Sequence, residues 1–161
     1  MAEKRPTILQ IIPELDTGGA ELSTIEIAEA IERAGGRAIV LSEGGRLVQR
    51  LRDTGAELQF FPAAAKNPVR LWWNGRRIAE VVRRDGVDLI HARSRAPAWS
   101  ALMAARRTGL PFVTTYHGAY NEHSPLKRLY NGVMARGDVV IANSQYTACL
   151  LYTSPSPRDR S

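Results

Sequence analysis

The sequence has a single cysteine and no long apolar run. Cys149 is that cysteine, and one thiol excludes an internal disulfide and a metal site built from several thiolates. No apolar stretch approaches the roughly 20 residues that a membrane-spanning helix needs, and the opening segment MAEKRPTILQ lacks the apolar core of a secretory signal. We therefore expect a cytoplasmic, soluble domain.

Several common nucleotide and nucleophile motifs are also missing. Neither the dinucleotide fingerprint GxGxxG nor the phosphate loop GxxxxGK[ST] occurs, and no GxSxG elbow is present. His117 and His123 lie six residues apart, unlike the i, i+4 pair of a helical zinc motif. These absences argue against a nicotinamide enzyme, a nucleotide hydrolase and a Ser/His/Asp hydrolase, and they predict no metal site.

The charge of the chain is clearly positive. Its 161 residues carry 22 Lys plus Arg against 16 Asp plus Glu, a formal charge of +6, and the isoelectric point is about 10.0. This balance favours an anionic partner, which can be nucleic acid, a phosphorylated ligand or acidic lipid. No helix-turn-helix, zinc or RNP pattern appears, so we do not expect nucleic acid binding.

Strand-sized apolar runs alternate with segments of helical periodicity. Strands are predicted at Thr7–Ile12, Arg37–Leu41, Glu57–Phe61, Asp88–His91, Pro111–Tyr116 and Asp138–Ala142. A first helix opens at Gly18-Gly19 and ends at Gly35-Gly36, and others are predicted at Arg46–Asp53, Val69–Arg84, Pro97–Arg107 and Pro125–Ala135. Parallel strands need crossover connections, which are usually helices. The pattern predicts a Rossmann-like, doubly wound α/β domain with a parallel sheet.

Ligands of such sheets bind outside the carboxyl ends of the strands, so the residues that follow each strand are candidates. Gly18 and Gly19 follow the first strand, and their backbone N–H groups at a helix start suit an anion such as a diphosphate. The alternative is a plain turn in which Glu21 interacts with the helix dipole.

Histidine, arginine, serine and asparagine follow the later strands. His117 ends the fifth strand and precedes Gly118; its imidazole can bind a substrate hydroxyl or stabilise developing charge, although a structural histidine is the alternative. The fourth strand is followed by Arg93, Ser94 and Arg95, and the sixth by Asn143 and Ser144. The arginines can bind phosphate or an acidic acceptor, and the serines can instead cap the next helices.

Four of these segments together resemble the N-terminal domain of the retaining, GT-B fold glycosyltransferases of family 4. They are TGGAE after the first strand, DLIHARSRAP, PFVTTYHG and DVVIANSQYT, and the resemblance extends over residues 6–148. It implies a two-domain enzyme that uses a nucleotide-sugar donor and no further cofactor. The acceptor would be a glycan or a lipid-linked glycan of cell-surface polysaccharide or lipopolysaccharide synthesis. The alternative is a non-catalytic module that binds a nucleotide-sugar or another anionic ligand.

The resemblance also assigns roles to individual residues. Gly18 and Gly19 would lie near the donor diphosphate, and His117 would face the transferred sugar as the catalytic residue. The acceptor side or the cleft would be lined by Arg93, Ser94, Tyr116, Gly118, Asn143 and Ser144. The family's donor-binding domain, with its ExxxxxxxE motif, is absent from this sequence, so we expect no turnover by this chain alone.

The last 13 residues, CLLYTSPSPRDRS, differ abruptly in composition from the rest. They resemble the translated read-through of a sequencing-library adapter, so residues 149–161 are predicted to be a non-native tail and residues 1–148 the native domain. The alternative is a natural Ser/Pro-rich disordered tail.

The segment RLWWNGRRIAEVVRR predicts a helix with one basic, tryptophan-bearing face. At about 100° per residue, Trp73, Arg77 and Arg84 lie opposite the apolar face formed by Leu71, Gly75, Ile78 and Val82. An exposed tryptophan among arginines suits an anionic membrane surface. Together with the lipid-linked acceptor that the family resemblance implies, it predicts a peripheral position at the inner face of the plasma membrane. The alternative is a solvated face with Trp73 packed on a loop.

Overall fold

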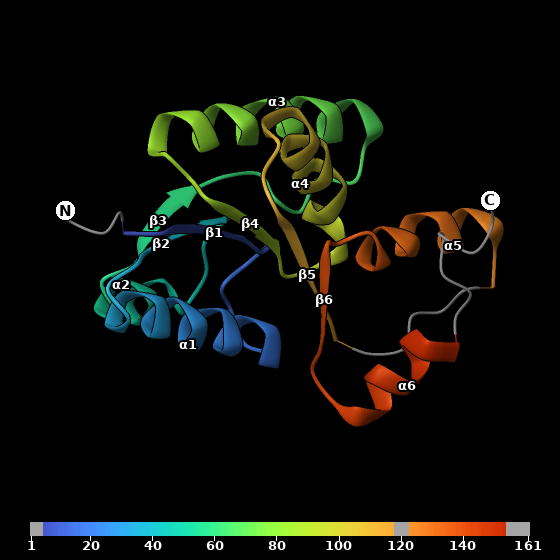
Figure 1. Cartoon of the computed structure of the whole chain (residues 1–161), viewed down its shortest axis with the longest axis horizontal. Helices are drawn as coiled ribbons and strands as arrows, with labels where there is room; N and C mark the ends of the chain where they lie inside the picture. The colour runs from blue at the N-terminus through green and yellow to red at the C-terminus, as the bar shows by residue number, and fades with distance from the viewer. Residues whose placement is uncertain (1–4, 118–122, 154–161) are drawn as a thin grey trace.

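The computed structural model describes residues 5–117 and 123–153, and the side chains in the second range as far as residue 149. Its centre is a parallel sheet with the strand order β3-β2-β1-β4-β5-β6 (Figure 1). The strands are β1 Thr7–Ile11, β2 Arg37–Ser42, β3 Glu57–Phe60, β4 Leu89–Ala92, β5 Phe112–Tyr116 and β6 Val139–Ala142. The predicted doubly wound fold is confirmed. Gly118 lies outside the described residues.

Helices follow every strand of the sheet. They are α1 Gly19–Arg33, α2 Val48–Asp53, α3 Pro68–Asp85, α4 Arg95–Thr108, α5 Pro125–Asn131, the 3₁₀ helix η1 Gly132–Ala135, and α6 Gln145–Thr153. The single helix predicted over Pro125–Ala135 is wrong, because the α-helix ends before Gly132 and a 3₁₀ turn continues the segment. Helix α6 continues across the predicted boundary between residues 148 and 149 without a break.

Two apolar cores lie on opposite faces of the sheet. Helices α3 and α4 cover one face and α1 and α2 cover the other (Figure 1). The larger core joins strand residues such as Leu9, Ile90 and Phe112 to Ile78 of α3 and Ala101 of α4. The smaller core is built from Ile12, Leu15, Ile25, Ala28, Ala38, Val40, Leu51 and Ala56. Strands buried on both faces explain the continuous apolar runs of the sequence.

Helix α3 has well-defined ends and a close neighbour. The Asn67 side chain accepts a hydrogen bond from the backbone N–H of Val69 at 2.9 Å and so caps the first turn. Gly86 ends the helix in the left-handed conformation, with φ of 64°. A Cβ added to Gly75 would lie 3.1 Å from Cβ of Met103, so the absence of a side chain there lets α3 and α4 pack closely.

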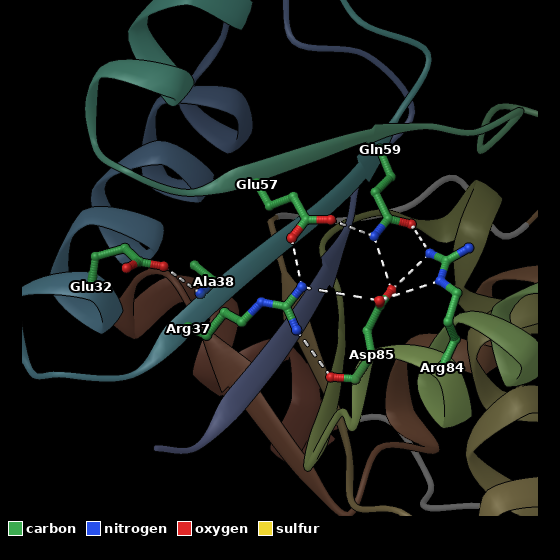
Figure 2. Close-up of polar contacts among 7 residues, drawn as sticks. All are labelled: Glu32, Arg37, Ala38, Glu57, Gln59, Arg84 and Asp85. Atoms are coloured by element: carbon green, nitrogen blue, oxygen red, sulfur yellow. Dashed lines mark hydrogen bonds and ion pairs between the residues drawn. The ribbon is translucent and has the colours of Figure 1, made fainter.

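A polar network closes the amino edge of the sheet between β2, β3 and the end of α3 (Figure 2). Arg37 donates hydrogen bonds to Glu57 at 2.6 Å and to the backbone carbonyl of Asp85 at 3.0 Å. Arg84 donates to Asp85 at 2.7 Å and to Gln59 at 2.7 Å. The hydrogen bond from Arg84 lowers the pKa of the Asp85 carboxyl, against a smaller opposing effect of burial. This network lies at the opposite edge of the sheet from the candidate site.

Candidate functional site

The carboxyl ends of β1, β4 and β5 gather side chains from three separate parts of the sequence. Strands β1 and β4 are neighbours in the sheet, and the chain leaves β1 toward β2 on its other side. This reversal of direction is the place where parallel sheets leave room for a ligand. The start of α1 lies at this edge, and the backbone N–H of Arg93 bonds to the carbonyl of Ile11 at 2.9 Å.

Arg93 lies beneath this edge, not on its surface. We expected it to line the cleft, but its exposed fraction is 1%. Its guanidinium donates to the hydroxyls of Thr24 and Thr115, each at 3.2 Å, and to the hydroxyl of Ser23. Among the described residues it forms no ion pair with a carboxylate. The side chain therefore brings a buried positive charge to the site, and the described groups that hydrogen-bond this charge are neutral.

His91 of β4 is the neutral neighbour of this charge. Its Nε2 lies 2.7 Å from the hydroxyl of Thr115 and 3.5 Å from Nη1 of Arg93. Burial lowers the pKa of His91 to about 3, and the positive charge of Arg93 contributes in the same direction. The imidazole is thus neutral at physiological pH and acts as a hydrogen-bonding member of the cluster.

His117 lies directly after β5, with its ring half buried. Its Nε2 atom is shielded from solvent and has no hydrogen-bond partner among the described residues. Burial lowers the pKa of His117, and Arg93 contributes in the same direction; a hydrogen bond with the backbone of Arg93 and the charge of Glu21 act against them. The ring therefore has a buried nitrogen whose hydrogen-bonding capacity no described residue uses, and such an atom calls for an explanation.

The glycine turn at the start of α1 holds a carboxylate. Gly18 is the N-cap of α1 and no side chain caps that end. Glu21 lies in the first turn, and its carboxylate occupies the space that a Cβ on Gly18 would need. A Cβ added to Gly19 would meet nothing within 4 Å. The open turn suits an anion, and Glu21 is the group already favoured by the helix dipole there.

The other predicted cleft residues surround this cluster at the ends of β4, β5 and β6. Ser94 precedes α4 and its hydroxyl caps nothing in that helix. Asn143 donates to the backbone carbonyl of His117 at 3.3 Å and accepts from Thr147 at 2.9 Å. Ser144 accepts from the backbone N–H of Thr147 at 3.1 Å, as expected for a helix cap. Tyr116 is partly buried against the larger core.

Three hydroxyl residues of the cluster were not among the predicted site residues. Ser23 and Thr24 come from the first turns of α1 and Thr115 from the interior of β5. Thr24 and Thr115 are buried, with exposed fractions of 0% and 3%. The signal that could have found them is a polar side chain at an apolar position, since a buried hydroxyl requires a partner.

The basic face of α3 lies apart from this cluster. Trp73 is 56% exposed, as predicted, and Trp72 beside it is 42% exposed. The Arg77 guanidinium lies over the ring of Phe61, 4.9 Å from its centroid, and Arg84 is hydrogen-bonded to Asp85 and Gln59 (Figure 2). The guanidinium carbon of Arg76 lies 5.1 Å from the centroid of the Trp72 ring. Arg76 forms an exposed group on α3 together with Trp72 and Trp73.

Neither a membrane span nor a metal cluster is found in the part of the chain that the structure describes. No helix in residues 5–117 and 123–153 combines the length and the apolar character needed to cross a bilayer. Over the same residues, His, Cys, Asp and Glu side chains form no group of three or more that could bind a metal ion.

The sequence matches the model of Glycosyltransferase Family 4 over residues 17–160. The match includes Gly18, Arg93, His117 and Asn143, and thus every part of the cluster described above. No curated protein matches the chain.

Solved structures with the same fold include several sugar-related enzymes. A glycosyltransferase from Rickettsia africae ESF-5 is 38% identical, with a TM-score of 0.81 over 94% of this chain. Anabaena Alr3699/HepE, solved in complex with UDP-glucose, is 23% identical, with a TM-score of 0.72 over 91% of the chain. A putative UDP-N-acetylglucosamine 2-epimerase from Listeria monocytogenes is 12% identical over 93% of the chain, with a TM-score of 0.65.

The coverage of these structures is one-sided. The chain spans about two fifths of their length, 40% for the Rickettsia and Anabaena proteins and 42% for the Listeria protein.

Proposed function

Because the chain belongs to glycosyltransferase family 4 and has the fold of the N-terminal half of GT-B enzymes, we propose that it forms the acceptor-side domain of a retaining glycosyltransferase. The parent enzyme transfers a sugar from a nucleotide-sugar to a glycan or lipid-linked acceptor in cell-surface polysaccharide or lipopolysaccharide synthesis. The observation that carries the proposal is Nε2 of His117, which no described residue hydrogen-bonds, at the carboxyl edge of the sheet and near Glu21 at the start of α1.

The proposed donor is a nucleotide diphosphate sugar. Anabaena Alr3699/HepE binds UDP-glucose in a structure of the same fold, and we propose the same class of donor here. Gly18 and Gly19 would approach the diphosphate with backbone N–H groups of α1. The buried charge of Arg93 adds positive potential at this edge, which favours an anionic group.

In the proposed reaction, the bond between the anomeric carbon and the diphosphate oxygen breaks and the acceptor hydroxyl oxygen bonds to that carbon on the same face. The acceptor proton passes to the leaving diphosphate, so the reaction needs no protein nucleophile. The imidazole of His117 would hydrogen-bond a sugar hydroxyl and stabilise the oxocarbenium-like transition state. The residues after β4 and β6, Ser94, Asn143 and Ser144, would line the acceptor side with Tyr116 and, outside the described residues, Gly118.

The test is His117→Ala in the complete parent enzyme. We expect kcat/KM for sugar transfer to fall by about 10²-fold or more, because a positioned acid-base or hydrogen-bonding side chain contributes on that order. His123→Ala is the matched control, since His123 is exposed and lies outside the cluster, and its activity should equal that of the wild type.

Two other outcomes would contradict the proposal. Full activity of His117→Ala would remove the residue from the mechanism. A parent protein that binds nucleotide-sugar but never transfers the sugar would favour the second candidate, a non-catalytic nucleotide-sugar binding module on the same fold.

We also propose that the parent enzyme works at the inner face of the plasma membrane. The support is the exposed group formed by Val69, Trp72, Trp73 and Arg76 on α3. Tryptophan rings settle at the headgroup level of a bilayer, and neighbouring arginines are attracted to anionic lipid. Arg77 packs on Phe61 and Arg84 pairs with Asp85. These two arginines would therefore contribute charge at the edge of the proposed membrane-binding surface of α3.

Finally, we propose that residues 149–161 are a non-native tail and that the parent continues into a donor-binding domain. The support is the change of composition after Ala148 and the coverage of 40% of the Rickettsia structure. On this proposal the chain alone catalyses no transfer, because the donor nucleotide would be bound mainly by the missing domain.

A further inference from the structure

Arg93 has an unusual environment for an arginine. It is among the largest fully buried side chains of the domain, and within the described part of the chain only hydroxyls and one imidazole surround its guanidinium. Burying an unpaired charge is costly, and natural proteins rarely do so without a use for it. Burial lowers the pKa of Arg93 only to about 10, so the side chain remains charged at physiological pH.

The hydrogen bonds of Arg93 connect the three elements that meet at the site. Its Nε and Nη2 donate to Thr24 and Ser23 of α1, and its Nη1 donates to Thr115 of β5. Its backbone is bonded to Ile11 of β1 and hydrogen-bonds His117. The start of α1 and the end of β5 are thus tied to one residue, which fixes where His117 lies relative to the glycine turn.

We propose that Arg93 is a positioning residue of the transfer site: its hydrogen bonds to α1 and β5 set the place of the His117 ring, and its buried charge, which no described carboxylate pairs, adds to burial in keeping that imidazole neutral for the sugar. This inference rests on the proposed function for its purpose, although the effect on His117 exists without it. Because the other ring nitrogen donates to the backbone of Arg93, Nε2 of the neutral ring can accept a hydrogen bond, whereas an imidazolium can only donate. A neutral ring also does not pair with the donor diphosphate, so it stays directed at the sugar.

Three charged or titratable groups face His117, and they act in opposite directions. Burial of the ring and then the positive charge of Arg93 disfavour protonation, whereas the hydrogen bond with the backbone of Arg93 and the carboxylate of Glu21 on α1 favour it. His91, the third group, is itself neutral because its pKa is lowered to about 3. From β6, Asn143 contributes a neutral amide that binds the backbone carbonyl of His117. The protonation state of His117 is therefore set first by burial, and the charges of Arg93 and Glu21 then act on it in opposite directions.

The experiment is an NMR titration of the His117 ring in this chain, compared among Arg93→Gln, Glu21→Gln and Arg106→Gln. We expect the pKa of His117 to shift upward in Arg93→Gln and downward in Glu21→Gln. Arg106→Gln is the matched control, because this substitution removes the same charge from the exposed end of α4. It should leave the pKa of His117 unchanged. An unchanged pKa in Arg93→Gln, or equal shifts in Arg93→Gln and Arg106→Gln, would overturn the proposal.

A second measurement covers the case in which Arg93→Gln does not fold. The low pKa of His117 in the wild type should persist from low to high salt, because a buried charge is poorly screened. A return to the ordinary pKa in high salt would assign the effect to surface charges and contradict the role of Arg93.

Activity of the complete parent enzyme gives an independent readout. Arg93→Gln should move the acidic limb of the kcat/KM profile to higher pH, and Arg93→Lys, which keeps the charge, should largely restore its position. A merely structural role would lower activity equally at every pH. The ring titration needs no sugar, so it stands or falls separately from the proposed transfer reaction.

Discussion

At the residue scale, the buried cluster shows how neutral and charged groups are arranged around one guanidinium. Arg93 donates to three hydroxyls, and the imidazoles of His91 and His117 are both kept from protonation by burial first and by Arg93 second. Acidification adds charge to a site that is already positive and poorly hydrated. The cluster is therefore expected to be the acid-sensitive part of the domain.

Stability should fall as the pH is lowered below 6.5. His91 has a pKa of about 3 in the folded domain against 6.5 ordinarily, so between these values the unfolded chain binds a proton that the folded chain does not. The free energy of unfolding then decreases by up to about 1.4 kcal/mol per pH unit for such a histidine. Urea unfolding at several pH values measures the slope, and His91→Gln should flatten it. The same slope in the variant would contradict this origin.

Carboxylates do not explain a loss in this window. The pKa of Asp85 is lowered from 3.8 by Arg84, so its contribution to stability is present above pH 3.8 and is lost only as the pH falls through the folded value. A decline that begins near pH 6.5 is the signature of the histidines.

The burial of Arg93 could not be predicted from its position in the sequence. Its partners Ser23 and Thr115 lie 70 and 22 residues away, and arginines are rarely buried without a carboxylate. His117 could be placed at the end of a strand because a β-branched run precedes it and a glycine follows. Its orphaned Nε2 and its neutral state depend on three-dimensional neighbours that a linear pattern does not contain.

At the element scale, α3 combines an interior face and an exposed aromatic end. Ile78, Ala79 and Val82 pack in the larger core, whereas Trp73 and Val69 are 56% and 64% exposed. Trp72 and Trp73 meet edge to face with centroids 5.3 Å apart. Two adjacent exposed tryptophans enlarge the apolar surface that can contact a bilayer beyond the single ring predicted from the sequence.

Binding to anionic liposomes should depend on this end of α3. Trp73→Ala should weaken binding by removing the exposed ring, and Arg76→Gln should weaken it about fivefold, since a basic residue near the surface contributes about 1 kcal/mol. Added salt should weaken it further. Flotation with vesicles of neutral or anionic lipid measures the effect. Tyr146→Ala is the control, because Tyr146 is 68% exposed on α6. Equal binding to both vesicle types would refute the electrostatic part.

The elements themselves were largely predictable. All six strands were predicted within about one residue at each end, because apolar β-branched runs are bounded by glycines and prolines. The segment Pro125–Ala135 was predicted wrongly. Its periodicity continues past Gly132 but the α-helix does not, and such a tightening into 3₁₀ geometry depends on packing against α4 that periodicity does not report.

At the scale of the whole molecule, the cluster lies at the carboxyl edge of the sheet, where β1 and β4 are neighbours. In the proposed parent, the donor-binding domain would face this edge, so substrates would be enclosed between two folded units. The family match extends over residues 17–160, and α6 continues to Thr153. Both pass the proposed boundary after Ala148, so the sequence of the gene is the test of that boundary.

Reading the source gene across the codon for Ala148 from unfragmented DNA tests this boundary. We expect the reading frame to continue past Ala148 with a sequence other than CLLYTSPSPRDRS, and to encode a second domain with a Gly-rich strand-turn followed by the ExxxxxxxE pattern. A gene that truly encodes Ser161 as its last residue would refute the proposal of a non-native tail and would favour a binding role over catalysis.

The strand order also has a consequence for how the chain reaches its fold. Strand β1 is central, yet its partner β4 pairs as Ile8 with Leu89, so one side of β1 remains open until residues about 80 positions later have been synthesised. Pairing across such a separation is slow, because loop-closure entropy must be overcome before the contacts form. On the ribosome, β1 can first pair with β2, and the site at the junction of β1 and β4 is among the last features to assemble.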